Sequence, residues 1–263
     1  MTKPEPKYRR PLNNHQILLL NTLYKFRFAT AALITESQKA KHIRVITSRL
    51  KILVDQDYLG MNYDSSYKIQ GRPATYYLTL RAVRYLREQP YSDESNLRSI
   101  YHDKRAKDTQ IQHRLHVFKV YNYFKHTHKG RFKFYSKTEL TSKDCLPRQR
   151  PDALITDPES DRAYFLDCLE DTMSYWTLRK TIKRYIYYFE QEIWQKAQDT
   201  PVPSVLIVCE SDQLRRRATS LIKKELDSTY AELEFLTTTD KAMVEGEKEI
   251  WTKFDESKEL TRL

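Results

Sequence analysis

Two acidic residues stand in neighbouring segments that we expect to be strands. Asp152 follows Pro151 near the start of the segment RPDALIT, and Asp167 lies in the next segment, AYFLDCLE, after 14 intervening residues. Carboxylates on adjacent strands can hold Mg²⁺ or Mn²⁺, which lowers the pKa of a bound water and offsets charge that develops on a phosphate. Asp152 and Asp167 are therefore candidate metal ligands and candidate catalytic residues.

The segments around these acids alternate between strand and helix patterns. A helical segment over 97–128 precedes expected strands at 131–136, 150–156 and 163–170, then a helix of about 25 residues and an apolar strand at 204–209. A helix at 212–227 and a strand near 232–237 complete the set. This order resembles the core of the PD-(D/E)xK nuclease superfamily, and the resemblance implies a mixed sheet flanked by helices.

The resemblance also implies a lysine two residues after the second acid, where it orients the nucleophile. Leu169 occupies that position, on the same strand face as Asp167. Two replacements are conceivable: Lys180 or Lys183 could reach in from the next helix, or Glu170 and Asp171 could supply the acid in a shifted register. The spacing does not decide between them.

Nearly all of the excess positive charge lies in the first third of the chain. Residues 1–89 hold 16 Lys and Arg against 6 Asp and Glu, whereas the remainder holds 30 against 29. A basic segment joined to a neutral one indicates that the first part meets a polyanion and the second does something else.

The basic third has the element order of a winged helix-turn-helix. Helices are expected at 14–27, 30–36 and 41–56, then strands at 58–63 and 74–79 joined by a turn-rich stretch, and a helix at 80–88. In that geometry the third helix enters the major groove and the hairpin tip touches the DNA backbone or minor groove.

The third helix is expected to bury one stripe and to present a polar face to DNA. The stripe comprises Ile43, Ile46, Leu50 and Leu53. Residue types that reach phosphates and base edges lie on the polar side of this helix, just before it, and on the wing. These candidate DNA-binding residues are Lys41, Arg44, Thr47, Ser48, Lys51, Lys68 and Arg72.

The predicted fold is therefore of the α+β or α/β class with two domains. We expect a winged helix DNA-binding domain at 1–89, a polar linker over 89–96, and a nuclease-like α/β domain at 97–240. Residues 241–263 are expected to form a peripheral C-terminal tail. The weakly patterned segment 240–263 is expected to be a peripheral helix.

Composition excludes several other classes. No apolar run approaches the roughly 18 residues of a membrane span, and the first residues lack the apolar stretch of a signal peptide. The 3 cysteines are scattered, as in a reduced cytoplasmic protein, and with only 4 Gly in the chain there is no glycine-rich phosphate loop.

Several segments together resemble the replication-relaxation family of plasmid and mobile-element proteins. They are GRPATYYLTLRAVRYL, RPDALI, FLDCLEDT and the helix containing KTIKRYIYYF, and the resemblance covers about residues 14–210. It implies a DNA-binding protein of replication, relaxation or transfer, with double-stranded DNA as its partner. A homodimer, or other replication or transfer proteins, are further candidate partners. The family pattern often has an acid-x-acid pair after the PD strand, where this chain has Asp167 and Leu169.

Two alternatives remain open at this point. The chain could be an active Mg²⁺- or Mn²⁺-dependent DNA endonuclease, with Asp152 and Asp167 as its acids. It could instead be a winged-helix transcriptional regulator whose C-terminal domain only dimerises or senses. The absent lysine favours a DNA-binding protein over an endonuclease, and retention of DNA affinity by residues 97–263 would exclude the regulator.

Overall fold

The computed structural model describes residues 11–89, 94–141, 143–229, 231–245, 250–253 and 260–261. It has the predicted mixed α and β composition and divides into two compact units, residues 1–122 and 123–263. Half of the predicted linker (residues 90–93), and much of the predicted tail, lie outside the described residues. Among the described residues, no helix has the length and hydropathy needed to cross a membrane.

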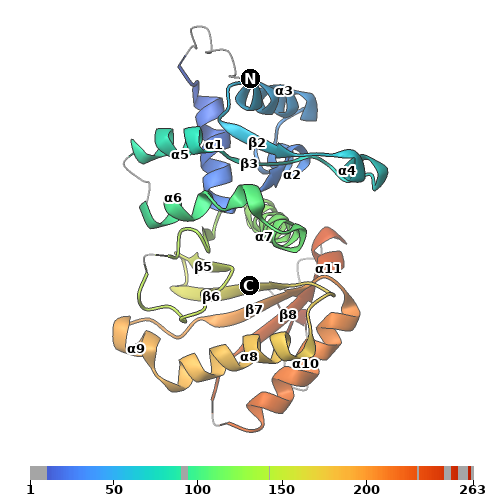
Figure 1. Cartoon of the computed structure of the whole chain (residues 1–263). Helices are drawn as coiled ribbons and strands as arrows, with labels where there is room; N and C mark the ends of the chain where they lie inside the picture. The colour runs from blue at the N-terminus through green and yellow to red at the C-terminus, as the bar shows by residue number, and fades with distance from the viewer. Residues whose placement is uncertain are drawn as a thin grey trace. The chain divides into compact units, whose positions relative to one another are not determined.

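The first unit combines helices with a small antiparallel sheet (Figure 1). Its strands are ordered β1-β3-β2. Capping side chains start its helices: Asn13 and Gln16 form a capping box before α1, while the hydroxyls of Thr30 and Thr79 cap α2 and α5. The elements up to α5 are α1 (Asn14–Phe26), β1 (Ala29–Thr30), α2 (Ala31–Ser37), α3 (Ile43–Asp55), β2 (Leu59–Asn62), α4 (Ser65–Ile69), β3 (Thr75–Leu78) and α5 (Leu80–Arg87).

Helix α3 packs through a shorter stripe than the sequence predicts. Ile46, Leu50 and Leu53 are fully buried, but Ile43 is 46% exposed. Ile43 is the first residue of the helix, so it lies at the end of the element rather than over the core. The predicted inclusion of Ile43 in the buried stripe is therefore wrong.

The β2–β3 connection is more ordered than the expected turn-rich stretch. It contains α4, whose first backbone N–H groups are capped by the carboxylate of Asp64. Gly71 follows with a φ of +64°, the left-handed conformation that glycine adopts without steric cost. The hairpin tip is thus a capped helical turn closed by a glycine.

The single helix predicted over 97–128 is divided in the structure. It comprises α6 (Glu94–Ile100), a short 3₁₀ turn η1 (Asp103–Arg105) and α7 (Asp108–Thr127). The interruption coincides with an ion pair between Asp103 and Arg27, 76 residues earlier in the chain. Local periodicity cannot anticipate a partner so distant.

The second unit is a seven-stranded mixed sheet in the order β10-β9-β8-β7-β6-β5-β4. Strands β6, β7 and β8 run parallel, and the other neighbours pair antiparallel. The strands are β4 (Lys133–Ser136), β5 (Ala153–Asp157), β6 (Arg162–Leu169), β7 (Ser204–Cys209), β8 (Phe235–Thr239), β9 (Trp251–Lys253) and β10 (Leu260–Thr261).

Helices α8 (Tyr175–Glu190) and α10 (Asp212–Leu226) cover one face of this sheet (Figure 1). Apolar side chains of both helices share a core with alternate residues of the strands, including Phe165 and Ile207. Two short helices, α9 (Ile193–Ala197) and α11 (Asp240–Glu245), follow α8 and β8.

The structure corrects the expectation of a peripheral helix over 240–263. Only α11 is helical among the described residues there, and Trp251–Lys253 adds strand β9 beside β8. Trp251 is 1% exposed, so this segment belongs to the core of the second unit. A strand of three residues is too short to produce a readable alternation in the sequence.

Candidate nucleic-acid interface and acidic site

The predicted polar face of α3 is exposed in the structure. Arg44, Thr47, Ser48 and Lys51 all face solvent, as does Lys41 just before the helix. The hydroxyl of Thr47 donates to the carbonyl of Ile43 within its own helix. Val45 and Ile52 are also more than two-fifths exposed, which gives this face apolar atoms beside its cationic and hydroxylic ones.

The two wing residues differ in their surroundings. Lys68 is exposed on α4. Arg72 is half-buried, forms an ion pair of 2.5 Å with Asp108 at the start of α7, and lies 4.5 Å from the ring centre of Tyr67. The Asp108 carboxylate raises the pKa of Arg72 through a hydrogen bond. Lys68 is therefore available to a ligand, whereas Arg72 has a partner within the protein.

The structure brings Asp152 and Asp167 together. Ala153 pairs with Leu166 in the antiparallel β5–β6 ladder, so Asp152, just before β5, stands beside Asp167. The Asp152 backbone N–H donates to Asp167 Oδ1 at 3.3 Å, and the Cys168 N–H donates to Asp152 Oδ2 at 3.1 Å. Both residues are at most 5% exposed.

Cations from the protein accompany this buried acid pair. Arg184 on α8 forms an ion pair and hydrogen bond with Asp167 Oδ2, and the Tyr185 hydroxyl donates to the same oxygen at 2.8 Å. Lys137 Nζ lies 3.9 Å from Asp152 Oδ1. Both oxygens of Asp167 thus accept hydrogen bonds from the chain itself.

This arrangement does not fit a metal site. Within the described part of the chain, no group of three or more His, Cys, Asp or Glu side chains is placed to hold a metal ion. Burial raises the pKa of Asp167, the Arg184 charge opposes that rise, and nearby Asp152 adds to it. The guanidinium supplies positive charge where the nuclease resemblance implies a divalent cation.

The lysine position of that resemblance is filled by the core. Leu169 is fully buried among the residues that pack against α8 and α10. Lys183 is 57% exposed and lies 3.6 Å from Glu225, which also pairs with Arg179. Neither Lys183 nor the exposed Lys180 stands in an ion pair with the two acids.

The shifted-register alternative is likewise not assembled around the acid pair. Glu170 is half-buried directly after β6, and its carbonyl accepts from the Met173 N–H. Asp171 is exposed, and its carboxylate accepts from the Ser211 hydroxyl at 2.5 Å. The side chains that pair with the acids include those of Lys137, Arg184 and Tyr185. The sequence did not predict these contacts because no motif identifies the three residues. Arg184 follows the candidate residue Lys183 directly in sequence, but it lies on another side of the helix.

A cavity of about 700 Å³ opens beside α8. It is lined by cationic side chains of the helix and of the segment before β5, together with tyrosines and other apolar groups. The lining residues are Pro147, Arg148, Gln149, Lys180, Lys183, Arg184, Tyr187, Tyr188 and Ile193. This cavity is where the structure places Lys180 and Lys183.

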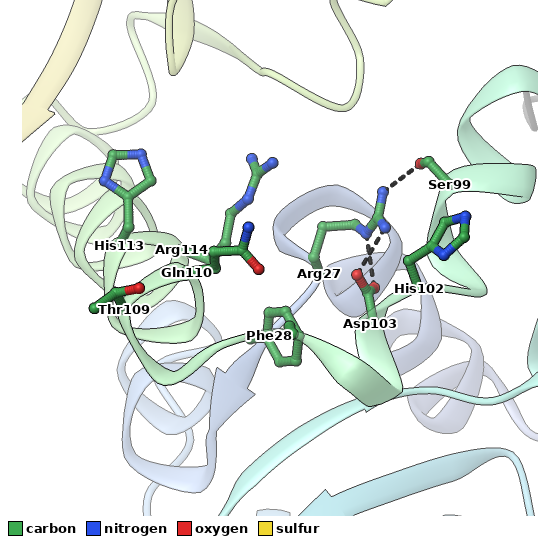
Figure 2. A pocket seen from close by; sticks show the side chains of 10 residues that line it. Arg27, Phe28, Ser99, His102, Asp103, Thr109, Gln110, His113 and Arg114 are labelled. Carbon is green, nitrogen blue, oxygen red and sulfur yellow. Dashed lines mark hydrogen bonds and ion pairs between the residues drawn. The ribbon is translucent and has the colours of Figure 1, made fainter. Parts of the chain in front are cut away.

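The first unit holds a smaller cavity of about 380 Å³ beside the end of α1 (Figure 2). Arg27 lies there with a φ of +71°, and it donates to both carboxylate oxygens of Asp103 at 2.7 Å and to the Ser99 hydroxyl at 2.6 Å. Gln110 and Arg114 extend from α7 on the other side (Figure 2). Because Arg27 and Asp103 satisfy each other, we assign this buried pair to holding η1 against α1 rather than to ligand chemistry.

Comparison with known proteins identifies one family. The family model described as replication-relaxation matches residues 20–202, which includes α3, the hairpin, the acid pair and α8. Neither the curated proteins nor the solved structures provide a match.

Proposed function

The chain belongs to the replication-relaxation family, and we propose that it is a DNA-binding protein acting in replication, relaxation or transfer of a plasmid or mobile element. Its first unit reads duplex DNA as a winged helix, with α3 in the major groove and the β2–β3 hairpin as the wing. Its second unit is a PD-(D/E)xK-like sheet that serves DNA binding or assembly rather than hydrolysis.

The exposed face of α3 carries the proposal for the first unit. Four side chains able to contact phosphates or base edges (Arg44, Thr47, Ser48 and Lys51) point away from the core on one helix. The helix is the third of three and precedes an antiparallel hairpin, which is the order of a winged helix. Residues 1–122 hold 22 Lys and Arg against 10 Asp and Glu, so the surrounding field also favours a polyanion.

The test is binding of the full chain to a fluorescent 30-base-pair duplex, followed by anisotropy. Arg44→Ala with Lys51→Ala should weaken binding about tenfold or more, because each lost phosphate contact removes a counterion-release contribution. The matched control, Arg84→Ala with Lys104→Ala, removes the same charge from exposed positions on α5 and η1 of the same unit. Equal affinity loss in both double variants would show that net charge, and not α3, determines binding.

The acid pair supports a binding role for the second unit. Asp152 and Asp167 are buried, hydrogen-bonded to the backbone, and matched by Arg184 and Lys137. An active endonuclease would need these carboxylates free to hold Mg²⁺ or Mn²⁺. We expect wild-type protein that binds a duplex to leave supercoiled plasmid uncut in the presence of either ion. Metal-dependent nicking by the wild type that disappears in the Asp152→Ala variant would overturn this part of the proposal.

A further inference from the structure

The outer face of α8 carries two lysines that lie between two aromatic side chains. Trp176, Lys180, Lys183 and Tyr187 recur at intervals of four, three and four residues, which places them in one stripe of the helix. The opposite face, with Leu178, Ile182 and Tyr185 among others, is buried against the sheet. We call these four outward residues the α8 stripe; it extends about 16 Å along the helix.

The aromatic rings of the stripe are exposed to an unusual degree. Trp176 is 71% exposed and Tyr187 is 62% exposed. The other two tryptophans, Trp194 and Trp251, are at most 6% exposed. A single exposed apolar residue needs no explanation, but two aromatic rings spaced along one helix with lysines between them form a regular pattern.

The cavity beside α8 continues this stripe. Lys180, Lys183 and Tyr187 belong both to the stripe and to the cavity lining, and Arg148 adds a cation from the segment before β5. Ile193 and Tyr188 supply apolar wall. Apolar walls beside cations suit a ligand whose planar groups are uncharged and whose linking groups are anionic.

Arg184 provides an independent sign of an anionic ligand. It lines the same cavity, its side chain is 10% exposed, and its Nε has no hydrogen-bond partner among the described residues. A buried, unsatisfied donor on a charged group is costly. An anion in the cavity would offset part of this cost through the charge of the guanidinium, because Arg184 lines the cavity wall.

The charge of this stripe is local. Residues 123–263 hold 24 Lys and Arg against 25 Asp and Glu, so the second unit as a whole does not attract polyanions. Glu225, which lies 3.6 Å from Lys183, is also engaged by Arg179. In the part of the chain that the structure describes, neither Lys180 nor Arg148 has an ion-pair partner.

From these observations we propose that the α8 stripe and its cavity bind single-stranded DNA, with bases stacked on Trp176 and Tyr187 and phosphates paired with Lys180, Lys183 and Arg148. Single strands expose base faces to aromatic side chains, which a duplex does not, and this explains why aromatic rings flank the cations of the stripe. The inference deepens the proposed role of the second unit by naming its ligand, and it does not depend on duplex binding by α3.

The test uses the full chain and a fluorescent fifteen-nucleotide oligo(dT), with binding followed by anisotropy. Trp176→Ala and Tyr187→Ala should each weaken single-strand binding about tenfold, since stacking of a base on an aromatic ring contributes about 1–3 kcal/mol and 1.4 kcal/mol is tenfold. Lys180→Ala with Lys183→Ala should weaken it similarly. Duplex affinity should remain unchanged in all three variants.

The matched control is Lys223→Ala with Lys224→Ala, which removes two exposed charges from α10 of the same unit. This variant should bind oligo(dT) as the wild type does. Far-UV circular dichroism checks folding, and the substituted side chains of the stripe are exposed, so the fold should persist.

Tryptophan emission supplies a second readout that a merely electrostatic surface would not change. Oligo(dT) should quench the fluorescence of Trp176, and Trp176→Phe should abolish the quenching while retaining most of the affinity. Loss of affinity in the lysine variant without any effect of the aromatic ones would overturn the proposal in favour of a nonspecific cationic surface. Wild-type protein that binds the duplex but not oligo(dT) would overturn it outright, and would leave the stripe to an acidic protein partner.

Discussion

At the scale of single residues, Arg184 changes how the acid pair is understood. A carboxylate pair on adjacent strands is expected to be a metal site, but here a helix contributes a guanidinium to Asp167 and a lysine stands near Asp152. Removing one member of such a buried pair is far more costly than removing both, because the remaining charge is left in a low-dielectric site.

We therefore expect Asp167→Ala to destabilise the second unit by about 3 kcal/mol. The double variant Asp167→Leu with Arg184→Met should recover much of this loss, since no unpaired charge remains. All three tryptophans lie in residues 123–263, so urea unfolding followed by tryptophan fluorescence reports this unit. A double variant no more stable than Asp167→Ala would contradict the charge-pair explanation.

The single variant Arg184→Met should show a pH dependence of known sign. Burial raises the pKa of Asp167 above its usual value, and loss of the arginine raises it further. A carboxyl whose pKa is higher in the folded state favours folding as the pH falls through that pKa, because the folded protein then binds the extra proton. The stability difference from wild type should therefore narrow between pH 7.5 and pH 5.5 in urea unfolding; a difference that widens would exclude Asp167 as the titrating group.

Residue chemistry was predictable where it depended on neighbours in sequence. The segments around Asp152 and Asp167 indicated adjacent strands, and the ladder places the two acids side by side. The Arg184 contact was not predictable, because Arg184 lies 17 positions after Asp167 on a helix that must first dock on the sheet. Ile43 was assigned to the buried stripe because periodicity does not reveal where a helix leaves its core.

At the scale of elements, the β2–β3 hairpin depends on two glycines for different reasons. Gly60 pairs across the ladder with Tyr77, and a Cβ at Gly60 would overlap the Tyr77 ring. That ring packs beside Phe28 and Ile111, so it cannot easily move. Gly71 has open space around its Cα, but its φ is +64°.

Gly60→Ala should accordingly lower the stability of the first unit by about 2–3 kcal/mol through overpacking. Gly71→Ala should cost about 1 kcal/mol, from backbone conformation alone. Thermal unfolding followed by far-UV circular dichroism measures both, while the tryptophan transition of the second unit should not shift. A Gly60→Ala variant as stable as Gly71→Ala would show that the ring yields.

The element order was predictable to a large extent, and the exceptions have physical causes. The helices at the start of the chain, the hairpin strands and the central strands β5, β6 and β7 were all expected from periodicity and apolar runs. The helical turn α4 was missed because it depends on a single cap, Asp64. Strand β9 was not predicted because its three residues are too few for a strand pattern and become a strand by pairing with β8.

At the scale of the whole molecule, the two units differ in charge and in proposed ligand. Residues 1–122 carry a net charge of +12 and residues 123–263 a net charge of −1. Each unit also has its own buried core and its own exposed helix, α3 or α8, with cationic side chains. A protein that binds both duplex and single-stranded DNA during relaxation or replication would need one binding surface for each, as proposed for these two units.

If each unit binds its own ligand, variants of the two units should lose different affinities, and the two affinities should depend differently on salt. The α3 variant should lose duplex affinity and keep oligo(dT) affinity, and the α8 lysine variant should do the reverse. With four candidate phosphate contacts at Lys41, Arg44, Lys51 and Lys68, log K for the duplex should fall with log salt at a slope of about −3.6. Three phosphate contacts to a single strand, at Lys180, Lys183 and Arg148, should give a slope of about −2. Anisotropy titrations between 50 and 300 mM NaCl measure both slopes. Equal slopes, together with loss of affinity for both duplex and oligo(dT) in each variant, would mean that one shared surface binds all DNA.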